Sequence, residues 1–139
     1  MDNAHRVLVV DDFEPWRRFV CSELEEHLES QIIAEASDGT EAVQKAGELQ
    51  PDLVLLDLGL PGLNGIEAAR RIRECAPKAK ILFVTENSSW EIAEEALRTG
   101  AHGYIVKEDA ELELMIAVNA VLQGEIFVGR RFMRGFRVT

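Results

Sequence analysis

Four apolar runs of the sequence end on side chains that can do chemistry. The run RVLVV is followed by the acidic pair Asp11 and Asp12, and the run LVLL is followed by Asp57. The run KILFV ends on the hydroxyl of Thr85, and the run GYIV ends on the ammonium of Lys107. In open parallel sheets the carboxyl ends of the strands share one edge, and ligands bind there. We therefore expect these five side chains to form one site.

Three carboxylates in one crevice repel each other, so such a site requires a cation or raised pKa values. Mg²⁺ suits a hard oxygen cluster, usually through one or two carboxylates and several waters, and Ca²⁺ accepts the same ligand type. A phosphoryl group on Asp57 would use the remaining parts, because Lys107 could neutralise its oxygens and Thr85 could donate a hydrogen bond. Carboxylates also act as nucleophiles that form aspartyl-phosphates.

Five predicted strands alternate with five helical patterns, and these elements must position the site. The run of Leu and Val before Asp57 is bounded by Pro51 and Gly59, which is typical of a strand buried on both faces. The alternation predicts an α/β fold with a doubly wound, five-stranded parallel sheet and right-handed crossovers. In the order 2-1-3-4-5, the strands that end on Asp11 and Asp57 are neighbours at the switch point. The predicted strands are residues 6–11, 31–36, 53–56, 80–85 and 103–107.

Polar residues mark the starts of four predicted helices. Asp38, Asn64, Ser88 and Asp109 each precede apolar residues at helical spacing. Short side chains with an oxygen acceptor are preferred at the N-cap, so we expect each of them to cap its helix.

The length of 139 residues favours one domain. We predict a domain of residues 1–125, followed in residues 126–139 by a basic tail or linker remnant. The N-terminus, MDNAHR, lacks the pattern of a signal peptide, and the apolar runs are too short to span a membrane. Cys21 and Cys75 have no metal-ligand spacing and suit reduced thiols, so we expect a cytoplasmic protein without membrane association.

The charges are unevenly divided along the chain. All 25 acids and 11 of the 15 bases lie within residues 1–125, which gives this part a net charge of −14. Four arginines give the tail a charge of +4. Because phosphate neutralisation supplies most of the affinity for nucleic acids, the acidic domain itself is not expected to bind them.

The acidic pair Asp11-Asp12, the segment LLDLGLPGLNG around Asp57, Thr85 and Lys107 together resemble the receiver domain of two-component response regulators. This family has the flavodoxin-like (βα)5 fold of the chemotaxis response protein. The resemblance covers about residues 5–125. The segments GLPGLNGIEAARRIRE and GAHGYIVKEDA are most similar to receivers of the LuxR/NarL type, in which the site lysine is often not followed by proline.

The resemblance implies that Asp57 accepts a phosphoryl group from a sensor histidine kinase or a phosphotransfer protein. It implies Mg²⁺ bound directly by Asp12, Asp57 and the backbone carbonyl of Gly59, with Asp11 acting through a water. Lys107 would pair with the phosphoryl oxygens. Such a domain is no enzyme beyond its own phosphotransfer and autodephosphorylation, and a homodimer is a further assembly that the resemblance allows.

The resemblance also implies a switch. Thr85 would move toward the phosphoryl group, and Tyr104 would turn inward behind it. This coupling would reshape the face made by the fourth helix, the fifth strand and the fifth helix, by shifting an equilibrium that already exists.

Two features depart from the family's pattern. Glu86 follows Thr85, where many receivers carry a small residue, and we expect its carboxylate to slow phosphotransfer or to alter dephosphorylation. The sequence reaches Thr139 without the helix-turn-helix domain into which LuxR/NarL-type regulators usually continue. A receiver fragment of a longer DNA-binding transcriptional regulator is therefore one alternative function.

Other function classes fit less of the sequence. A degenerate receiver that binds partners without phosphorylation remains an alternative because of Glu86. A phosphatase of the haloacid dehalogenase type usually has a second aspartate two residues after its nucleophile, and that position is Gly59 here. A dinucleotide or P-loop enzyme would need a glycine-rich turn where this chain has Asp11 and Asp12.

Overall fold

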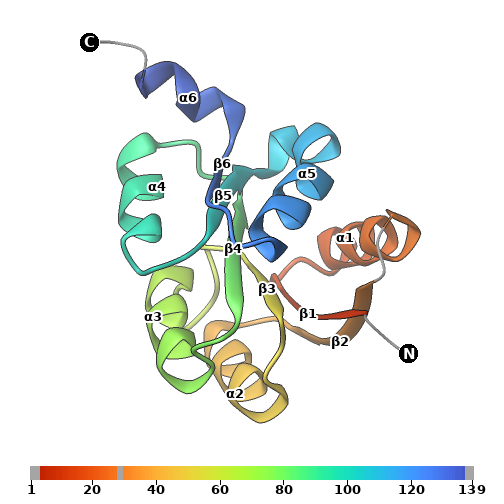
Figure 1. Cartoon of the computed structure of the whole chain (residues 1–139). Helices are drawn as coiled ribbons and strands as arrows, with labels where there is room; N and C mark the ends of the chain where they lie inside the picture. Colours follow the sequence, from red (N-terminus) through yellow and green to blue (C-terminus); the bar gives the residue numbers. More distant parts are fainter. Residues whose placement is uncertain (1–3, 28–29, 137–139) are drawn as a thin grey trace.

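The computed structural model describes residues 4–27 and 30–136, and strands and helices alternate along most of that length (Figure 1). The strands are β1 (His5–Val10), β2 (Ser30–Ala36), β3 (Leu53–Leu56), β4 (Lys80–Thr85), β5 (Gly103–Val106) and β6 (Phe127–Val128). The helices are α1 (Glu14–His27), α2 (Gly39–Leu49), α3 (Gly65–Cys75), α4 (Trp90–Leu97), α5 (Ala110–Leu122) and α6 (Arg130–Phe136), with a short 3₁₀ turn η1 (Lys107–Asp109) before α5.

The strands form one parallel sheet in the order β2-β1-β3-β4-β5-β6. The predicted order of the first five strands is confirmed, but the prediction of five strands is wrong by one. β6 pairs with the outer edge of β5, with Phe127 opposite Gly103 and Val128 opposite Tyr104. A strand of two residues is too short to show the alternation of apolar and polar residues that predicts a strand. The local sequence therefore did not predict β6.

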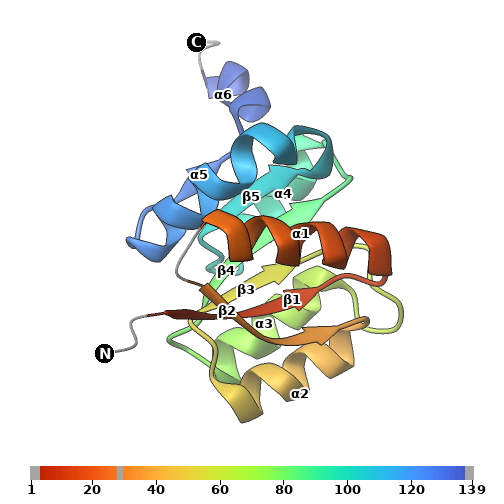
Figure 2. The ribbon, with the colours of Figure 1, turned by 90° about the vertical axis from the view of Figure 1, so that its right-hand side faces the viewer.

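Helices cover both faces of the sheet. Figure 2 shows α1 and α5 on one face, and α2, α3 and α4 lie on the other. Because successive residues of a strand point to opposite faces, Leu53 and Leu55 of β3 pack toward α1 and α5, whereas Val54 and Leu56 pack toward the other three helices. All four side chains are buried, as predicted for a strand covered on both faces.

Two of the predicted helix caps are confirmed. Oδ1 of Asp38 accepts a hydrogen bond from the backbone N–H of Glu41 at 2.8 Å, and Oδ1 of Asn64 accepts one from Glu67 at 3.0 Å. Asn64 thereby begins α3 directly after the loop that follows Asp57, which helps to fix that loop.

Of the other two predicted caps, Ser88 is wrong, and Asp109 stands at the N-cap position of α5 without a capping hydrogen bond. α4 is capped by Ser89, whose hydroxyl accepts a hydrogen bond from Ile92, and not by Ser88. Asp109 makes no capping hydrogen bond, because its carboxylate receives two hydrogen bonds from the guanidinium of Arg131 instead. Within the described residues, no helix has the length and apolar character that crossing a membrane requires.

Gly65 lies so close to the end of β3 that a side chain does not fit. A Cβ there would collide with the carbonyl oxygen of Asp57 and would lie 2.7 Å from Cα of Leu58. The N–H of Gly65 also donates to the carbonyl of Leu58 at 2.9 Å. The first residue of α3 therefore rests directly on the backbone that carries Asp57.

We expect Gly65→Ala to lower the free energy of unfolding by about 2 kcal/mol or more, because backbone atoms cannot yield to the added methyl group. Gly47→Ala is the matched control, since a Cβ there would make an ordinary contact of 3.5 Å with Sγ of Cys75. In the last turn of α2 this change should raise the free energy of unfolding by about 0.5–1 kcal/mol, because alanine has the higher helix propensity. Urea denaturation measures both values, and equal effects of the two substitutions would contradict the steric argument.

Candidate functional site

The carboxyl ends of β1, β3, β4 and β5 bring the predicted site residues to one edge of the sheet. The backbone N–H of Asp57 donates to the carbonyl of Val10 at 3.1 Å, which joins the ends of β3 and β1. Carboxylate oxygens of Asp11, Asp12 and Asp57 all lie within 4.8 Å of one another. Nζ of Lys107 lies 2.6 Å from Oδ2 of Asp11 and 3.4 Å from Oδ2 of Asp57.

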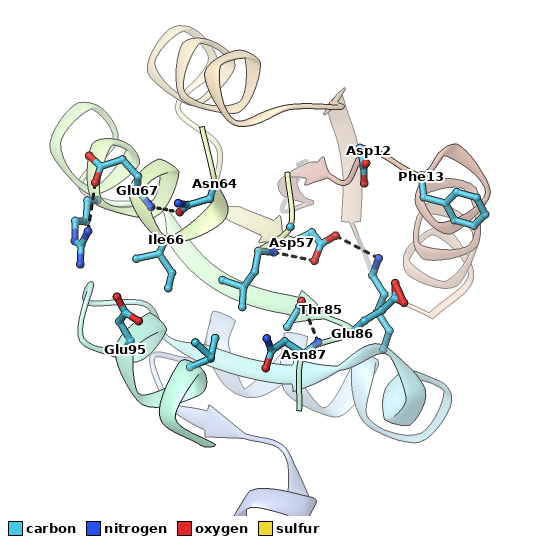
Figure 3. A pocket seen from close by; sticks show the side chains of 15 residues that line it. Asp12, Phe13, Asp57, Asn64, Ile66, Glu67, Thr85, Glu86, Asn87 and Glu95 are labelled. Atoms are coloured by element: carbon cyan, nitrogen blue, oxygen red, sulfur yellow. Dashed lines mark hydrogen bonds and ion pairs between the residues drawn. The ribbon is translucent and has the colours of Figure 1, made fainter. Parts of the chain in front are cut away.

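Asp12, Asp57 and Lys107 line an open cavity of about 830 Å³. Figure 3 shows Asp57 near its centre, with Asp12 on one side and Thr85 and Glu86 on the other. The cavity is lined by Asp12, Phe13, Asp57, Leu58, Gly59, Asn64, Ile66, Glu67, Arg70, Thr85, Glu86, Asn87, Ile92, Glu95 and Lys107. It is wide enough to admit a small anionic group between Asp57 and the β4–α4 loop.

Two of the three acids of the site are buried, and Lys107 is half-buried. Asp11 is 1% exposed and Asp57 is 7% exposed. Burial raises the pKa of Asp11 above its ordinary value, against the opposing effect of Lys107. Burial alone would lower the pKa of Lys107, but its hydrogen bonds and the charges of Asp11 and Asp57 outweigh burial and raise it. One ammonium is thus shared by two buried carboxylates.

The cluster has the donor chemistry of a site for a hard cation. All its donors are oxygens, and three carboxylates face a single ammonium, with Oδ2 of Asp11 2.6 Å from Nζ of Lys107. Oδ1 of Asp57 accepts a hydrogen bond from the N–H of Leu58 at 2.8 Å, which leaves Oδ2 facing Lys107. Asp12 is exposed, so one carboxylate of the cluster can reach an incoming ion without losing a partner. These residues could therefore hold a divalent metal such as Mg²⁺.

Two residues of α1 support the site in ways that the sequence did not reveal. The ring of Trp16 lies under Lys107, with its centroid 5.1 Å from Nζ, a distance at which a cation is attracted to an aromatic face. The guanidinium of Arg17 donates to the carbonyl of Asp11 at 2.7 Å and to Glu35 at 2.9 Å. The helical spacing indicated only that Trp16 faces the core, and nothing in the sequence linked Arg17 to Asp11.

Thr85 and Tyr104 are joined through one loop residue. Oγ1 of Thr85 accepts a hydrogen bond from the backbone N–H of Asn87 at 3.3 Å, and the hydroxyl of Tyr104 donates to the carbonyl of Asn87 at 2.9 Å. Tyr104 is fully buried behind the cavity, and burial raises its pKa, so the hydroxyl stays protonated as a donor. In this structure Tyr104 already lies inward.

The chain matches a family model, curated proteins and solved structures. A family model described as "Response regulator receiver domain" matches residues 7–119. The chain is 36% identical over 124 residues to the oxygen regulatory protein NreC of Staphylococcus epidermidis, which covers 88% of this chain and 57% of that protein. It is 35% identical over 122 residues to the transcriptional activator protein ExaE of Pseudomonas putida, with the same coverage of both chains.

A solved structure matches over nearly the whole chain. It is the two-component response regulator of the LuxR family from Aurantimonas sp. SI85-9A1, with 34% sequence identity and a TM-score of 0.92. The match covers 99% of this chain and 100% of that one, whereas this chain spans only 57% of the two curated relatives. Since the family model covers most of the chain, this protein belongs to the family of response regulator receiver domains.

Proposed function

We propose that this receiver domain is a phosphoacceptor and that Asp57 takes the phosphoryl group. The observation that carries the proposal is the position of Asp57. Its carboxylate lies near the centre of the cavity, 3.4 Å from the ammonium of Lys107 and grouped with Asp11 and Asp12. No other carboxylate lining that cavity has both a neighbouring ammonium and two acidic neighbours within the part of the chain that the structure describes.

The reaction would be an in-line displacement at phosphorus. An oxygen of Asp57 attacks the phosphorus of a phosphohistidine on a sensor histidine kinase or phosphotransfer protein. The new P–O bond forms as the P–N bond breaks, and the imidazole leaves with the electron pair. Lys107 would pair with the phosphoryl oxygens, and the hydroxyl of Thr85 would donate to one of them. Attack of water on the same phosphorus would later restore the carboxylate.

Mg²⁺ is the cation that the oxygen donors suit best. Asp12, Asp57 and the backbone carbonyl of Gly59 would hold it directly, and Asp11 would act through a water. When bound, the ion supplies positive charge beside the transferring group. The grouping of three carboxylates within 4.8 Å of one another, with Lys107 as the neighbouring ammonium, supports this assignment.

The whole protein is proposed to be longer than this chain. The relative ExaE is named a transcriptional activator, and the chain spans 57% of its length. We therefore propose a regulator of transcription in which this domain receives the signal and a separate domain binds DNA, with a homodimer as a further assembly. A receiver that binds partners without phosphorylation is the competing function, and Glu86 at the mouth of the cavity favours it.

Incubation with Mg²⁺ and acetyl phosphate, followed by intact mass measurement, tests the phosphoacceptor proposal. We expect a gain of one phosphoryl group in the wild type and none in Asp57→Asn. Asp52→Asn is the matched control, because Asp52 precedes the same strand at its opposite end and should leave the gain unchanged. No gain in the wild type would favour the unphosphorylated receiver, and release of many equivalents of phosphate would indicate a phosphatase.

Lys107→Met should lower the free energy of unfolding at about pH 7 by roughly 2 kcal/mol or more, because two buried carboxylates lose their shared partner. The raised pKa of Lys107 means that the lysine itself stays charged at all lower pH values, and that its contribution is lost at high pH as the pH rises through the folded pKa. The loss should be smaller when it is measured at about pH 4, because burial raises the pKa of Asp11, so that as the pH falls Asp11 takes up a proton more readily than an ordinary aspartate.

Urea denaturation at the two pH values measures this difference. Arg98→Met is the control, since the exposed pair Arg98–Glu94 at 3.7 Å should contribute little at either pH. An equal loss at both pH values in Lys107→Met would show that the lysine does not compensate the buried acids.

Glu86→Gln should speed phosphorylation by acetyl phosphate about two- to fivefold, because an exposed carboxylate beside the cavity repels an incoming anion. The rate should also rise less steeply with salt than in the wild type, since salt screens the same repulsion. Glu95→Gln, on the far side of the cavity, controls for net charge. Identical phosphorylation and dephosphorylation rates in wild type and Glu86→Gln would refute a role for this residue.

A further inference from the structure

The edge of β5 is occupied by the chain's own C-terminal segment. The backbone N–H of Phe127 donates to the carbonyl of His102 at 2.9 Å, and that of Gly129 donates to the carbonyl of Tyr104 at 2.9 Å. These bonds add β6 to the sheet, and Figure 1 shows α6 continuing from it beyond the ends of α4 and α5. We refer to residues 127–133 as the C-terminal clasp.

The clasp packs against Tyr104, whose hydroxyl is linked through Asn87 to Thr85 of the site. Phe132 is 6% exposed, although it lies only a few residues from the end of the described chain. Its ring meets that of Tyr104 edge-on, with centroids 5.5 Å apart, and it meets Trp90 of α4 at 5.8 Å. Phe132 thus backs Tyr104 in the inward position, in which the Tyr104 hydroxyl reaches the carbonyl of Asn87.

Polar contacts also join the clasp to Glu108 and Asp109, the two residues of η1 that follow Lys107. The guanidinium of Arg131 donates to both carboxylate oxygens of Asp109, at 2.7 and 3.0 Å, and to Glu108 at 2.9 Å. The backbone N–H of Arg130 donates at 2.8 Å to Oε2 of Glu113, which is 3% exposed. A buried carboxylate in α5 therefore accepts from the first turn of α6, and α4, β5 and α5 all contact the clasp.

Two routes connect the clasp to Asp57. One runs from Phe132 through Tyr104 and Asn87 to Thr85, which lines the cavity. The other runs from Arg131 to Glu108 and Asp109, the two residues directly after Lys107. Any movement of Thr85 or Lys107 toward a group on Asp57 must therefore be accommodated by the contacts of the clasp.

We propose that docking of the C-terminal clasp and occupancy of the Asp57 site stabilise each other, so that the signal leaves this domain through its own C-terminal segment. This proposal rests on the proposed phosphoacceptor function. The sequence predicts that the face of α4, β5 and α5 transmits the signal. Residues 127–133 already contact all three elements, so we propose that the signal passes to these residues first. The resemblance implies an inward Tyr104 when Asp57 carries a phosphoryl group, and Phe132 supports that same position, so we expect the coupling to be positive.

Hydrogen exchange with and without beryllofluoride tests the coupling in the intact chain. Mg²⁺, beryllium and fluoride are added, and binding is followed by ¹⁹F NMR. We expect amide exchange in a peptide that contains Phe127 and Gly129 to slow by about fivefold or more when beryllofluoride binds, the low end of typical coupling between sites. In Asp57→Asn the same additions should leave that peptide unchanged.

Substitutions test the reverse direction. Phe132→Ala should weaken beryllofluoride binding by about fivefold or more, since binding and docking must affect each other equally. Met133→Ala is the matched control, because Met133 lies on the same helix with 47% of its surface exposed, and its removal should leave binding unchanged. Arg131→Ala, which removes only surface ion pairs, should weaken binding in the same direction if Phe132→Ala folds poorly.

The outcomes separate the two proposals. Beryllofluoride that binds without slowing exchange in the clasp, and with equal affinity in wild type, Phe132→Ala and Arg131→Ala, would overturn the coupling and leave the phosphoacceptor function standing. Tighter binding in Phe132→Ala would also overturn it, because the sign would be reversed. Absence of a bound ¹⁹F signal in the wild type would overturn both.

Discussion

The ammonium of Lys107 lies between two carboxylates that the fold buries side by side, and this arrangement constrains the rest of the structure. Asp11 and Asp57 can be neighbours only if β1 and β3 are adjacent, which the strand order of the sheet provides. β5 must then deliver the lysine across the end of β4. With one cation for two buried acids, the site retains a demand for positive charge. An anionic group would need further positive charge to enter, so under the proposed function electrostatics would link phosphoryl binding to metal binding.

Much of the fold and the membership of the site followed from local patterns. The apolar runs locate the buried strands, and the first polar residue after each run must emerge at the carboxyl edge, as Asp57 and Lys107 do. Asp38 and Asn64 were predictable because an N-cap depends on residues only three positions away. The sequence could not rank the partners of Lys107, since which acid lies nearer is decided by the twist of the sheet and the packing of side chains.

What the sequence did not predict depends on contacts between distant residues. Asp109 has the chemistry of a helix cap, but Arg131, 22 positions away, takes its carboxylate, so a long-range ion pair overrides a local preference. β6 depends on two long-range contacts. It pairs with the edge of β5, and the ring of Phe132 packs against that of Tyr104. Glu113 illustrates the same limit. Its carboxylate is buried in an apolar helix and accepts a hydrogen bond from the N–H of Arg130, a partner 17 positions away that the local sequence does not indicate.

The two-residue strand β6 also bears on the solubility of the molecule. Parallel sheets have two edges, and an uncovered edge offers unpaired backbone groups to the edge of another molecule. β6 engages the outer edge of β5 and then turns into a helix, which cannot extend the sheet further. Complete detachment of residues 127–133 would uncover that edge together with the ring of Phe132, and both are features that promote self-association. Physical chemistry therefore favours a small rearrangement of this segment over its release, and limits how far the chain can move without aggregating.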